Sequence, residues 1–282
     1  LSEQDEIILF AHNTGTLCVQ PLREKQLLTQ YISLESRSAV EIDRELIAAY
    51  IAGAEQIILT SHSMTTEFRQ VVRRSITKLS NFDIFESTAT RSKSGNLVVS
   101  MLTDTLEALE TRDRPIALEV VERDADMDRI NLLVSRQFNQ FLTNLIPSNS
   151  DTSLTTLNYY KHVCIRLERI ADHIVKICRT FLQLKAKDEF SLTKGEVIII
   201  KKLIHDLEEC AMMVDQLSKT KAHEIINEYE NINKNEYLDK KILDQKSKNI
   251  LIQNSLERIR SYIANIAEET LDYCSISELI KK

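Results

Sequence analysis

The chain has 282 residues, of which 43% are hydrophobic and 28% are charged, and its formal net charge is −6. This length supports one large or two modest domains with real cores, and the negative charge excludes nucleic-acid binding driven by overall charge. No apolar run approaches the roughly 20 residues that span a bilayer. Five scattered cysteines without a Cys-x-x-Cys pair favour a reducing compartment, so we expect a cytoplasmic protein without membrane insertion.

The first segment of the chain favours a β-hairpin. Residues 5–10 and 16–20 are short runs of strand-forming residues, and Asn13-Thr14-Gly15 between them is a turn sequence. The chain begins at Leu1 rather than at a methionine, so we expect upstream residues to be missing.

The next segment alternates between helical and strand patterns, which predicts a small α/β domain. The polar stretch 87–95 that follows is rich in Ser, Thr and Lys and is expected to be a linker with residues missing nearby. The expected elements are a helix at 41–52, a strand at 56–60, a helix at 65–79 and a strand at 82–85.

From Asn96 onward the chain favours long helices, because these 187 residues contain one glycine and two prolines. Pro115 suits a first helical turn and Pro147 ends a helix. The expected helices cover about 97–112, 115–146, 153–186, 193–228 and 248–273.

This helical part contains an internal repeat. Residues 167–170, Leu-Glu-Arg-Ile, return as residues 256–259 at an offset of 89 positions. Residues 117–121 resemble residues 222–226 at an offset of 105, and the offsets differ because the second unit has a shorter connection. We therefore expect a mostly α protein of two three-helix-bundle repeats, preceded by the small α/β domain and the hairpin. The expected domains are residues 1–25, 26–92, 93–188 and 189–282.

Two pairs of carboxylates interrupt apolar helix faces in the first repeat. Asp124 and Asp128 are four residues apart and follow Ala117 and Val121 on the predicted inward face of helix 115–146. Glu168 and Asp172 have the same spacing on helix 153–186, which the Pro147 turn makes an antiparallel neighbour. Four carboxylates at one level would form an all-oxygen site that suits iron, manganese, magnesium or calcium better than a soft metal.

A solvated helix face with interhelical salt bridges is the alternative interpretation, and Asp172 has Arg169 and Lys176 as nearby cations. A ferritin-like diiron site would need Glu-x-x-His motifs, and no acidic residue precedes any of the six histidines by three positions. His173, directly after Asp172, is either an extension of a metal site or a surface histidine.

Catalytic signatures are absent from the sequence. The four glycines lie far apart, which excludes a glycine-cradled phosphate site, and no hydrolase or zinc-protease motif occurs. We therefore expect a protein that is not an enzyme, with a metalloenzyme as a distant alternative.

With these motifs in view, residues 96–275 resemble the PhoU family of phosphate-uptake regulators. The most specific part is Glu168-Arg169-Ile170-Ala171-Asp172-His173. The resemblance implies two three-helix repeats whose acidic motifs bind iron or zinc, or another divalent metal, with Asp124, Asp128, Glu168 and Asp172 as the ligands. The second repeat departs from that pattern. Tyr229 and Asn233 stand where aspartates are expected, and Glu257 is followed by Ser261.

Residues 1–21 resemble the end of an AbrB-type swapped-hairpin domain, through Asp5-Glu6-Ile7 and Gly15-Thr16-Leu17. The resemblance implies that a DNA-contacting half would precede Leu1. The expected function is non-enzymatic regulation of phosphate uptake by a homodimer that docks on a phosphate transporter ATPase or a sensor protein. The alternative is an AbrB-type transcriptional regulator that binds DNA and uses its helical part for sensing or oligomerisation.

Overall fold

The computed structural model describes residues 7–10, 29–34, 37–54, 56–60, 70–75, 87–142, 153–184, 191–234 and 250–280. These residues divide into two compact units, which are described separately. The first unit comprises residues 1–86 and 132–154, and the second comprises residues 87–131 and 155–282. Within the described part of the chain, none of the helices combines the length and the hydropathy that crossing a lipid bilayer needs.

The first unit contains a three-stranded mixed sheet in the order β1-β3-β2. β2 is parallel to β3 and is joined to it through helix α1, while β1 is antiparallel to β3. Residues 16–20, predicted as the hairpin partner of β1, lie outside the described residues, so the AbrB-like domain stays a prediction. The elements are β1 (Ile7–Phe10), β2 (Thr29–Ser33), α1 (Ala39–Ile51) and β3 (Gln56–Thr60).

Helix α1 is well defined at both ends. Ser38 and Glu41 form a capping box at its start, in which each side chain accepts from the other residue's backbone N–H. After the helix ends, Gly53 adopts a φ of 95°, which the absence of a side chain permits. The core of this unit packs α1 against the sheet and includes Ile32, Leu34, Ile42, Leu46, Ala49, Ile57, Leu59, Val71 and Val72.

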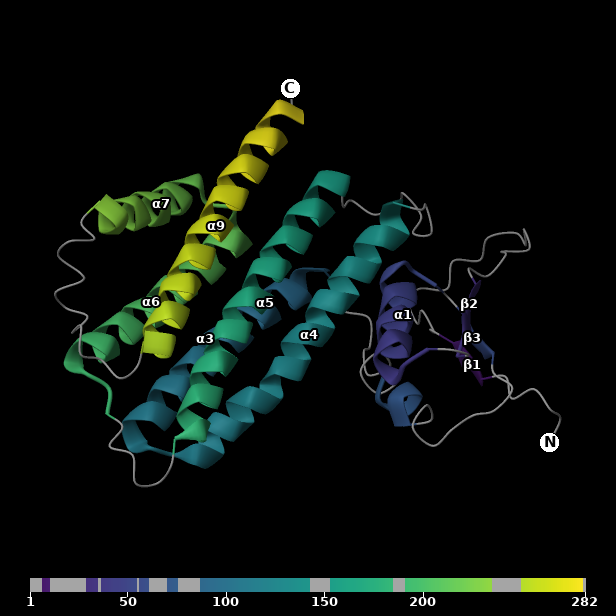
Figure 1. Cartoon of the computed structure of the whole chain (residues 1–282). Helices are drawn as coiled ribbons and strands as arrows, with labels where there is room; N and C mark the ends of the chain where they lie inside the picture. The colour runs from purple at the N-terminus through teal and green to yellow at the C-terminus, as the bar shows by residue number, and fades with distance from the viewer. Residues whose placement is uncertain are drawn as a thin grey trace. The chain divides into compact units, whose positions relative to one another are not determined.

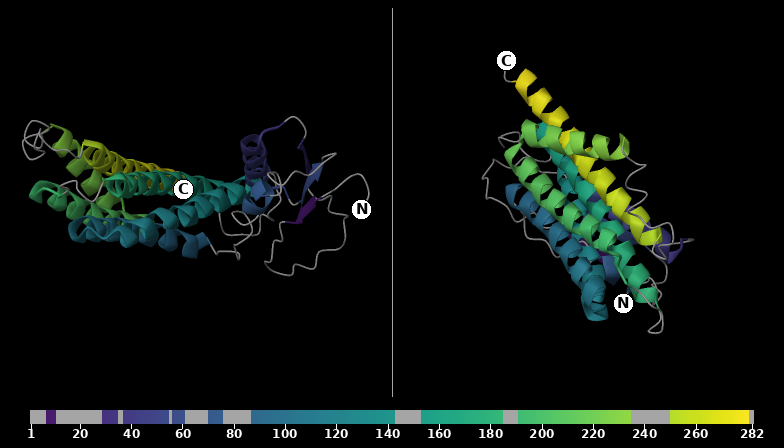
Figure 2. Two further views of the ribbon diagram at one scale, coloured as in Figure 1. Left: turned by 60° about the horizontal axis from the view of Figure 1, so that its bottom comes forward. Right: turned by 90° about the vertical axis from the view of Figure 1, so that its left-hand side faces the viewer.

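The second unit is a bundle of long helices, to which helix α4 contributes its residues up to 131. In this bundle α5 and α9 run side by side (Figures 1 and 2). The predicted architecture of two three-helix repeats is confirmed: α3, α4 and α5 form the first repeat and α6, α7 and α9 the second. Their bounds are α3 (Ser87–Thr111), α4 (Arg114–Leu142), α5 (Leu154–Gln183), α6 (Lys194–Gln216), α7 (Lys219–Lys234) and α9 (Ile250–Ile280).

Equivalent positions of the two repeats carry equivalent cores. The four apolar residues that follow the predicted offset of 89 are buried in both copies, each at most 7% exposed. Burial of matched Leu and Ile side chains supplies the hydrophobic stabilisation of each repeat. These residues are Leu167, Ile170, Ile174 and Ile177 on α5, and Leu256, Ile259, Ile263 and Ile266 on α9.

The joints between the first and second helices of the two repeats are also equivalent, at the offset of 105. Arg112 after α3 and Leu217 after α6 both adopt left-handed backbone conformations, with φ of 59° and 52°. The next N–H donates to the carbonyl five residues earlier in both cases, which is a Schellman-type end. Asp113 then caps α4 and Ser218 caps α7 through their side-chain oxygens.

Three boundary predictions were wrong. The stretch 87–95 is helical rather than a linker, because Ser, Thr and Lys are compatible with a helix. Its Gly95 permits close packing, since a Cβ there would lie 3.1 Å from Ala211 Cβ. The predicted helix 193–228 is two helices, divided at Leu217. The last helix extends to Ile280 rather than to 273. The predicted strand at 82–85 lies outside the described residues.

Candidate metal centre

The carboxylates of α4 lie at the edge of its buried face. The fully buried line of this helix runs through Ala117, Val120 and Met127. Val121, predicted to face inward, is only half-buried, so the buried face is displaced by one position from the predicted one. Asp124 and Asp128 lie beside that line and are half-buried, with the Asp124 side chain 23% exposed.

Glu168 on α5 is the carboxylate that is most affected by its acidic neighbours. Its side chain is 16% exposed, and Asp172, four residues on, is 44% exposed. Burial raises the pKa of the Glu168 carboxyl, and the negative charges of Asp172, Asp128 and Asp124 raise it further. The structure therefore places Asp124, Asp128 and Asp172, on two helices of the first repeat, within electrostatic reach of Glu168.

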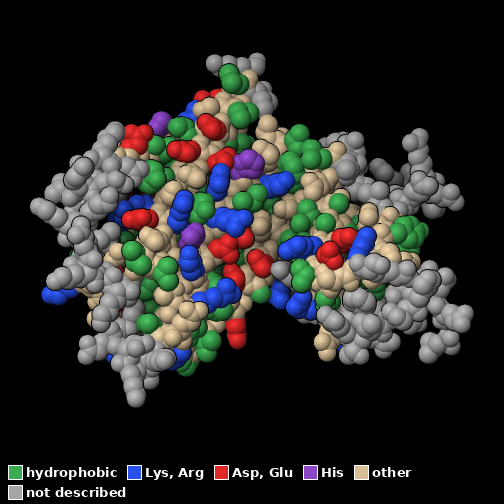
Figure 3. All heavy atoms as spheres, viewed as in Figure 1, with side chains coloured by type: hydrophobic (Ala, Val, Ile, Leu, Met, Phe, Trp, Pro, Cys, Tyr) green, Lys and Arg blue, Asp and Glu red, His purple; other side chains and the backbone are tan. Residues whose placement is uncertain are grey.

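Arginines partly compensate this negative charge. Arg169 lies 3.5 Å from a Glu168 carboxylate oxygen and 3.3 Å from one of Asp172, and it lowers the pKa of Glu168. Arg179, nearly three turns further along α5 than Arg169, lies 3.8 Å from Asp124. Figure 3 shows acidic side chains gathered over the middle of α4 and α5, with Lys and Arg side chains around them.

The donor set fits a divalent cation in chemistry, since it supplies hard oxygen ligands with a deficit of positive charge. The four carboxylate side chains do not already converge on a single ion position. Among the described residues, no three His, Cys, Asp or Glu side chains are gathered closely enough to hold an ion. A cation would therefore have to replace Arg169 as the partner of Glu168 and Asp172, with Asp124 and Asp128 completing the oxygen set.

The matching positions of the second repeat form an uncharged contact. Tyr229 on α7 donates from its hydroxyl to Ser261 Oγ on α9, at 3.4 Å. Glu257 is exposed to solvent. The side chain of Asn233 lies outside the described ones. The departure noted in the sequence thus corresponds to a hydrogen bond where the first repeat has carboxylates.

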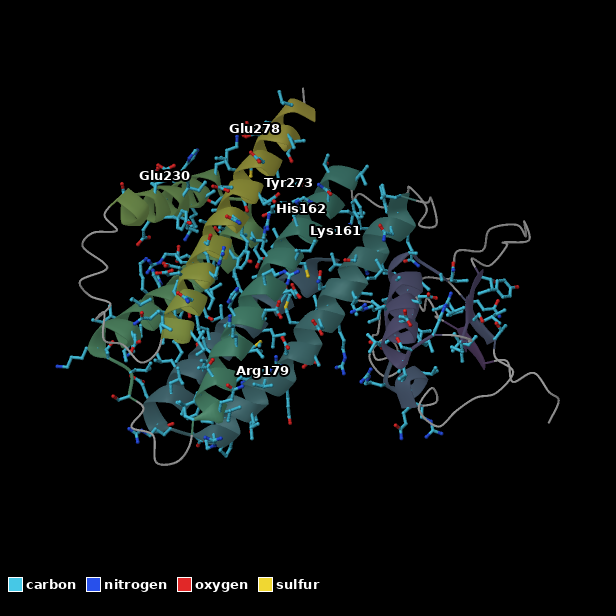
Figure 4. The ribbon with its side chains drawn as sticks, viewed as in Figure 1. Lys161, His162, Arg179, Glu230, Tyr273 and Glu278 are labelled. Atoms are coloured by element: carbon cyan, nitrogen blue, oxygen red, sulfur yellow. The ribbon has the colours of Figure 1, made fainter. Side chains whose placement is uncertain are left out.

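A polar seam between α5 and α9, which has no signal in the sequence, joins the two repeats. The hydroxyl groups of Thr156 and Tyr273 form a hydrogen bond of 2.9 Å. His162 Nδ1 lies 3.1 Å from a carboxylate oxygen of Glu269. Arg166 lies 3.6 Å from the same Glu269 carboxylate. His162 and Tyr273 are labelled in Figure 4, near one end of the two helices. These partners are more than 100 positions apart in the sequence, so no local spacing could indicate them.

Comparison with known proteins supports the family resemblance. Residues 92–181 match the PhoU domain. The chain is 37% identical over 90 residues to the phosphate-specific transport system accessory protein PhoU homolog of Clostridium acetobutylicum. It is 34% identical over 89 residues to the phosphate-specific transport system accessory protein PhoU of Edwardsiella tarda. The first repeat is therefore similar in sequence to the PhoU domain. These matches cover 32% of the chain, and 39% and 36% of the two relatives, so the chain spans less than half the length of either.

Solved PhoU structures share the fold over a larger part of the chain. The phosphate transport system regulatory protein PhoU from Streptococcus pneumoniae superposes with a TM-score of 0.55 at 25% identity, covering 65% of this chain and 91% of that one. PhoU from Pseudomonas aeruginosa gives a TM-score of 0.55 at 22% identity, covering 66% and 94%. The first repeat, with its carboxylates, therefore lies in the region matched by sequence, and the fold match is wider.

Proposed function

We propose that this chain is a non-enzymatic regulator of phosphate uptake and phosphate homeostasis. The PhoU domain at residues 92–181 supports the proposal, together with relatives that are named accessory proteins of phosphate-specific transport. Regulation would depend on which protein partner the helical bundle holds, because the charge and shape of its surface determine docking. The proposed partner is a phosphate transporter ATPase or a sensor protein, and the proposed assembly is a homodimer.

Phosphate uptake by host cells tests the regulatory role. Cells lacking the gene should fail to reduce uptake when external phosphate is abundant, and the wild-type gene should restore the response. The transporter ATPase should co-purify with the tagged chain, and light scattering should give twice the chain mass. Unchanged uptake control in the deletion strain would contradict the proposal.

The second part of the proposal is that Asp124, Asp128, Glu168 and Asp172 hold iron, zinc or another divalent metal. The single observation that carries it is the crowding of negative charge around Glu168. A bound cation would relieve this repulsion and would fix α4 against α5 through their shared ligands. The metal would thereby control the surface that a partner contacts.

Metal analysis of the purified protein tests this site. The Asp124→Ala/Asp128→Ala variant should lose the metal, and the control Glu257→Ala/Glu268→Ala should keep it, because it removes two exposed carboxylates of α9. Metal at 100 times its Kd should also stabilise the wild type by about 2.7 kcal/mol in denaturation experiments. Equal metal content in both variants would exclude the four-carboxylate site.

A further inference from the structure

Positive charges from both repeats surround His173, at the seam between α5 and α9. Arg169, His173 and Lys176 are four and three positions apart, so they lie on one face of α5. On α9, Tyr262 packs with its ring centre 5.9 Å from that of His173. Arg258 is four positions before Tyr262, one turn away on the same face of α9. Contact between the two rings thus brings cations of the two repeats together.

Two cations of this group lack matching acids. Among the described residues, no carboxylate forms an ion pair with Lys176 or with Arg258, and both side chains belong to exposed residues. Their neighbours on the surface are neutralised: Arg166 faces Glu269 at 3.6 Å, and Arg179 faces Asp124 at 3.8 Å. The uncompensated positive charge is therefore confined to about one helical turn on either side of His173.

His173 itself has an unsatisfied polar atom. Its Nδ1 is buried and has no hydrogen-bond partner among the described residues. The cations that the contact between His173 and Tyr262 brings together repel one another, so an anion among them would relieve the repulsion.

We propose that Arg169, His173, Lys176 and Arg258 form a binding site for a small oxyanion with the size and charge of phosphate. Arginine guanidinium groups bind phosphate oxygens through paired N–H donors, and Lys176 adds a point charge. A small ion suits the site better than an extended acidic chain, because the positive charge does not continue along the seam. The site would use Arg169 and Arg258, which are equivalent residues of the two repeats at the offset of 89.

Arg169 would link this site to the carboxylates. Its guanidinium contacts Glu168 and Asp172 in the present structure, so it is available to the anion only in part. The oxyanion site rests on the basic residues around His173 and does not depend on the proposed role in phosphate uptake. Failure of the uptake experiment would leave it standing.

Calorimetric titration of the full chain with inorganic phosphate tests the site. The wild type should bind one equivalent, and Lys176→Gln/Arg258→Gln should weaken binding about tenfold, which corresponds to about 1.4 kcal/mol. The control Lys194→Gln/Lys201→Gln removes two exposed positive charges of α6 and should bind as the wild type does. Phosphate should also shift the imidazole NMR signal that disappears in His173→Gln. Thermal melting of each variant establishes that it is folded.

Three results would overturn the site. Equal weakening in the two double variants would mean that phosphate responds only to overall charge. Undiminished binding by Lys176→Gln/Arg258→Gln would place the anion elsewhere. Binding of a glutamate-rich peptide to this surface without binding of inorganic phosphate would identify a docking surface for an acidic chain instead.

Discussion

The two repeats differ where they face solvent and agree where they pack. Both have a left-handed residue at the joint between their first and second helices, Arg112 in one and Leu217 in the other. Both bury the same four apolar positions on their third helix. At the positions of the acidic motif, however, the first repeat has carboxylates crowded around Glu168, and the second has the Tyr229–Ser261 hydrogen bond.

The difference indicates which residues the fold requires and which are available for function. Buried leucines, isoleucines and helix caps contribute to stability in both copies, so both copies retain them. At the positions of these carboxylates the second repeat has Tyr229 and Ser261, so the three-helix fold does not require carboxylates there. The carboxylates specific to the first repeat are therefore located on a helical scaffold that both repeats share.

The largest expected effect concerns the shared core. Ile170→Ala and Ile259→Ala remove equivalent side chains that are both fully buried. Each should lower the free energy of unfolding by about 3 kcal/mol, because each leaves a cavity between helices. Chemical denaturation measures both. A much smaller loss for Ile259→Ala would show that the second repeat is packed less tightly and would break the equivalence.

The joints provide a second comparison. Arg112→Gly and Leu217→Gly replace side chains that disfavour a positive φ, and each should raise the free energy of unfolding by up to about 1 kcal/mol. The gain should be smaller at Leu217, which is half-buried and loses packing on substitution. Thermal melting of the two variants would measure the difference. Destabilisation by both substitutions would contradict the assigned backbone conformation.

Substitutions of Arg169 and Arg258 distinguish the proposed metal site from the proposed oxyanion site. Arg169→Gln should tighten divalent metal binding by about fivefold, because an exposed ion pair worth up to about 1 kcal/mol no longer competes with the metal. Arg258→Gln should leave metal affinity unchanged. Both should weaken phosphate binding. Metal titrations of the two variants make the comparison, and identical metal affinities would show that Arg169 does not compete at the carboxylates.

The smallest expected effect concerns pH. The raised pKa of Glu168 means that the native state binds this proton more tightly than the unfolded state does. The free energy of unfolding should therefore fall as the pH rises from the ordinary value of 4.5 through the raised pKa. Glu168→Gln should remove the contribution of this carboxyl to the pH-dependent decrease in the free energy of unfolding. The substitution should also stabilise the metal-free protein at pH 7 by about 0.5 kcal/mol. Denaturation across this pH range, with Glu257→Gln as the matched control, measures it; a steeper fall in Glu168→Gln would reverse the assignment.

The helical part was largely predictable because apolar residues recur at helical spacing through it, with few glycines or prolines. The break at Leu217 was missed because neither residue type occurs there. The internal repeat would have located it, since Pro115 marks the equivalent joint 105 positions before Thr220. The Ser, Thr and Lys residues of 87–95 suggested a linker. Gly95 instead lies where two helices approach closely, and sequence alone does not reveal such packing.

The candidate site was predictable in part, for a physical reason. The spacing of four within Asp124/Asp128 and Glu168/Asp172 places each pair on one helix face. Arg179 pairs with Asp124 across two helices, and Tyr262 of the other repeat packs against His173. Such contacts arise from tertiary packing, and no local pattern contains them. The metal, the protein partner and the DNA-binding half stay predictions.

The aromatic residues at the seam give this molecule an internal optical reporter. Tyr159 on α5 stacks on Tyr273 of α9, with ring centroids 4.4 Å apart and planes inclined by 10°. Because the chain has no tryptophan, tyrosines alone account for its intrinsic fluorescence. Separation of the two repeats would unstack this pair and alter the emission, so ligand-induced opening could be followed without attaching a dye.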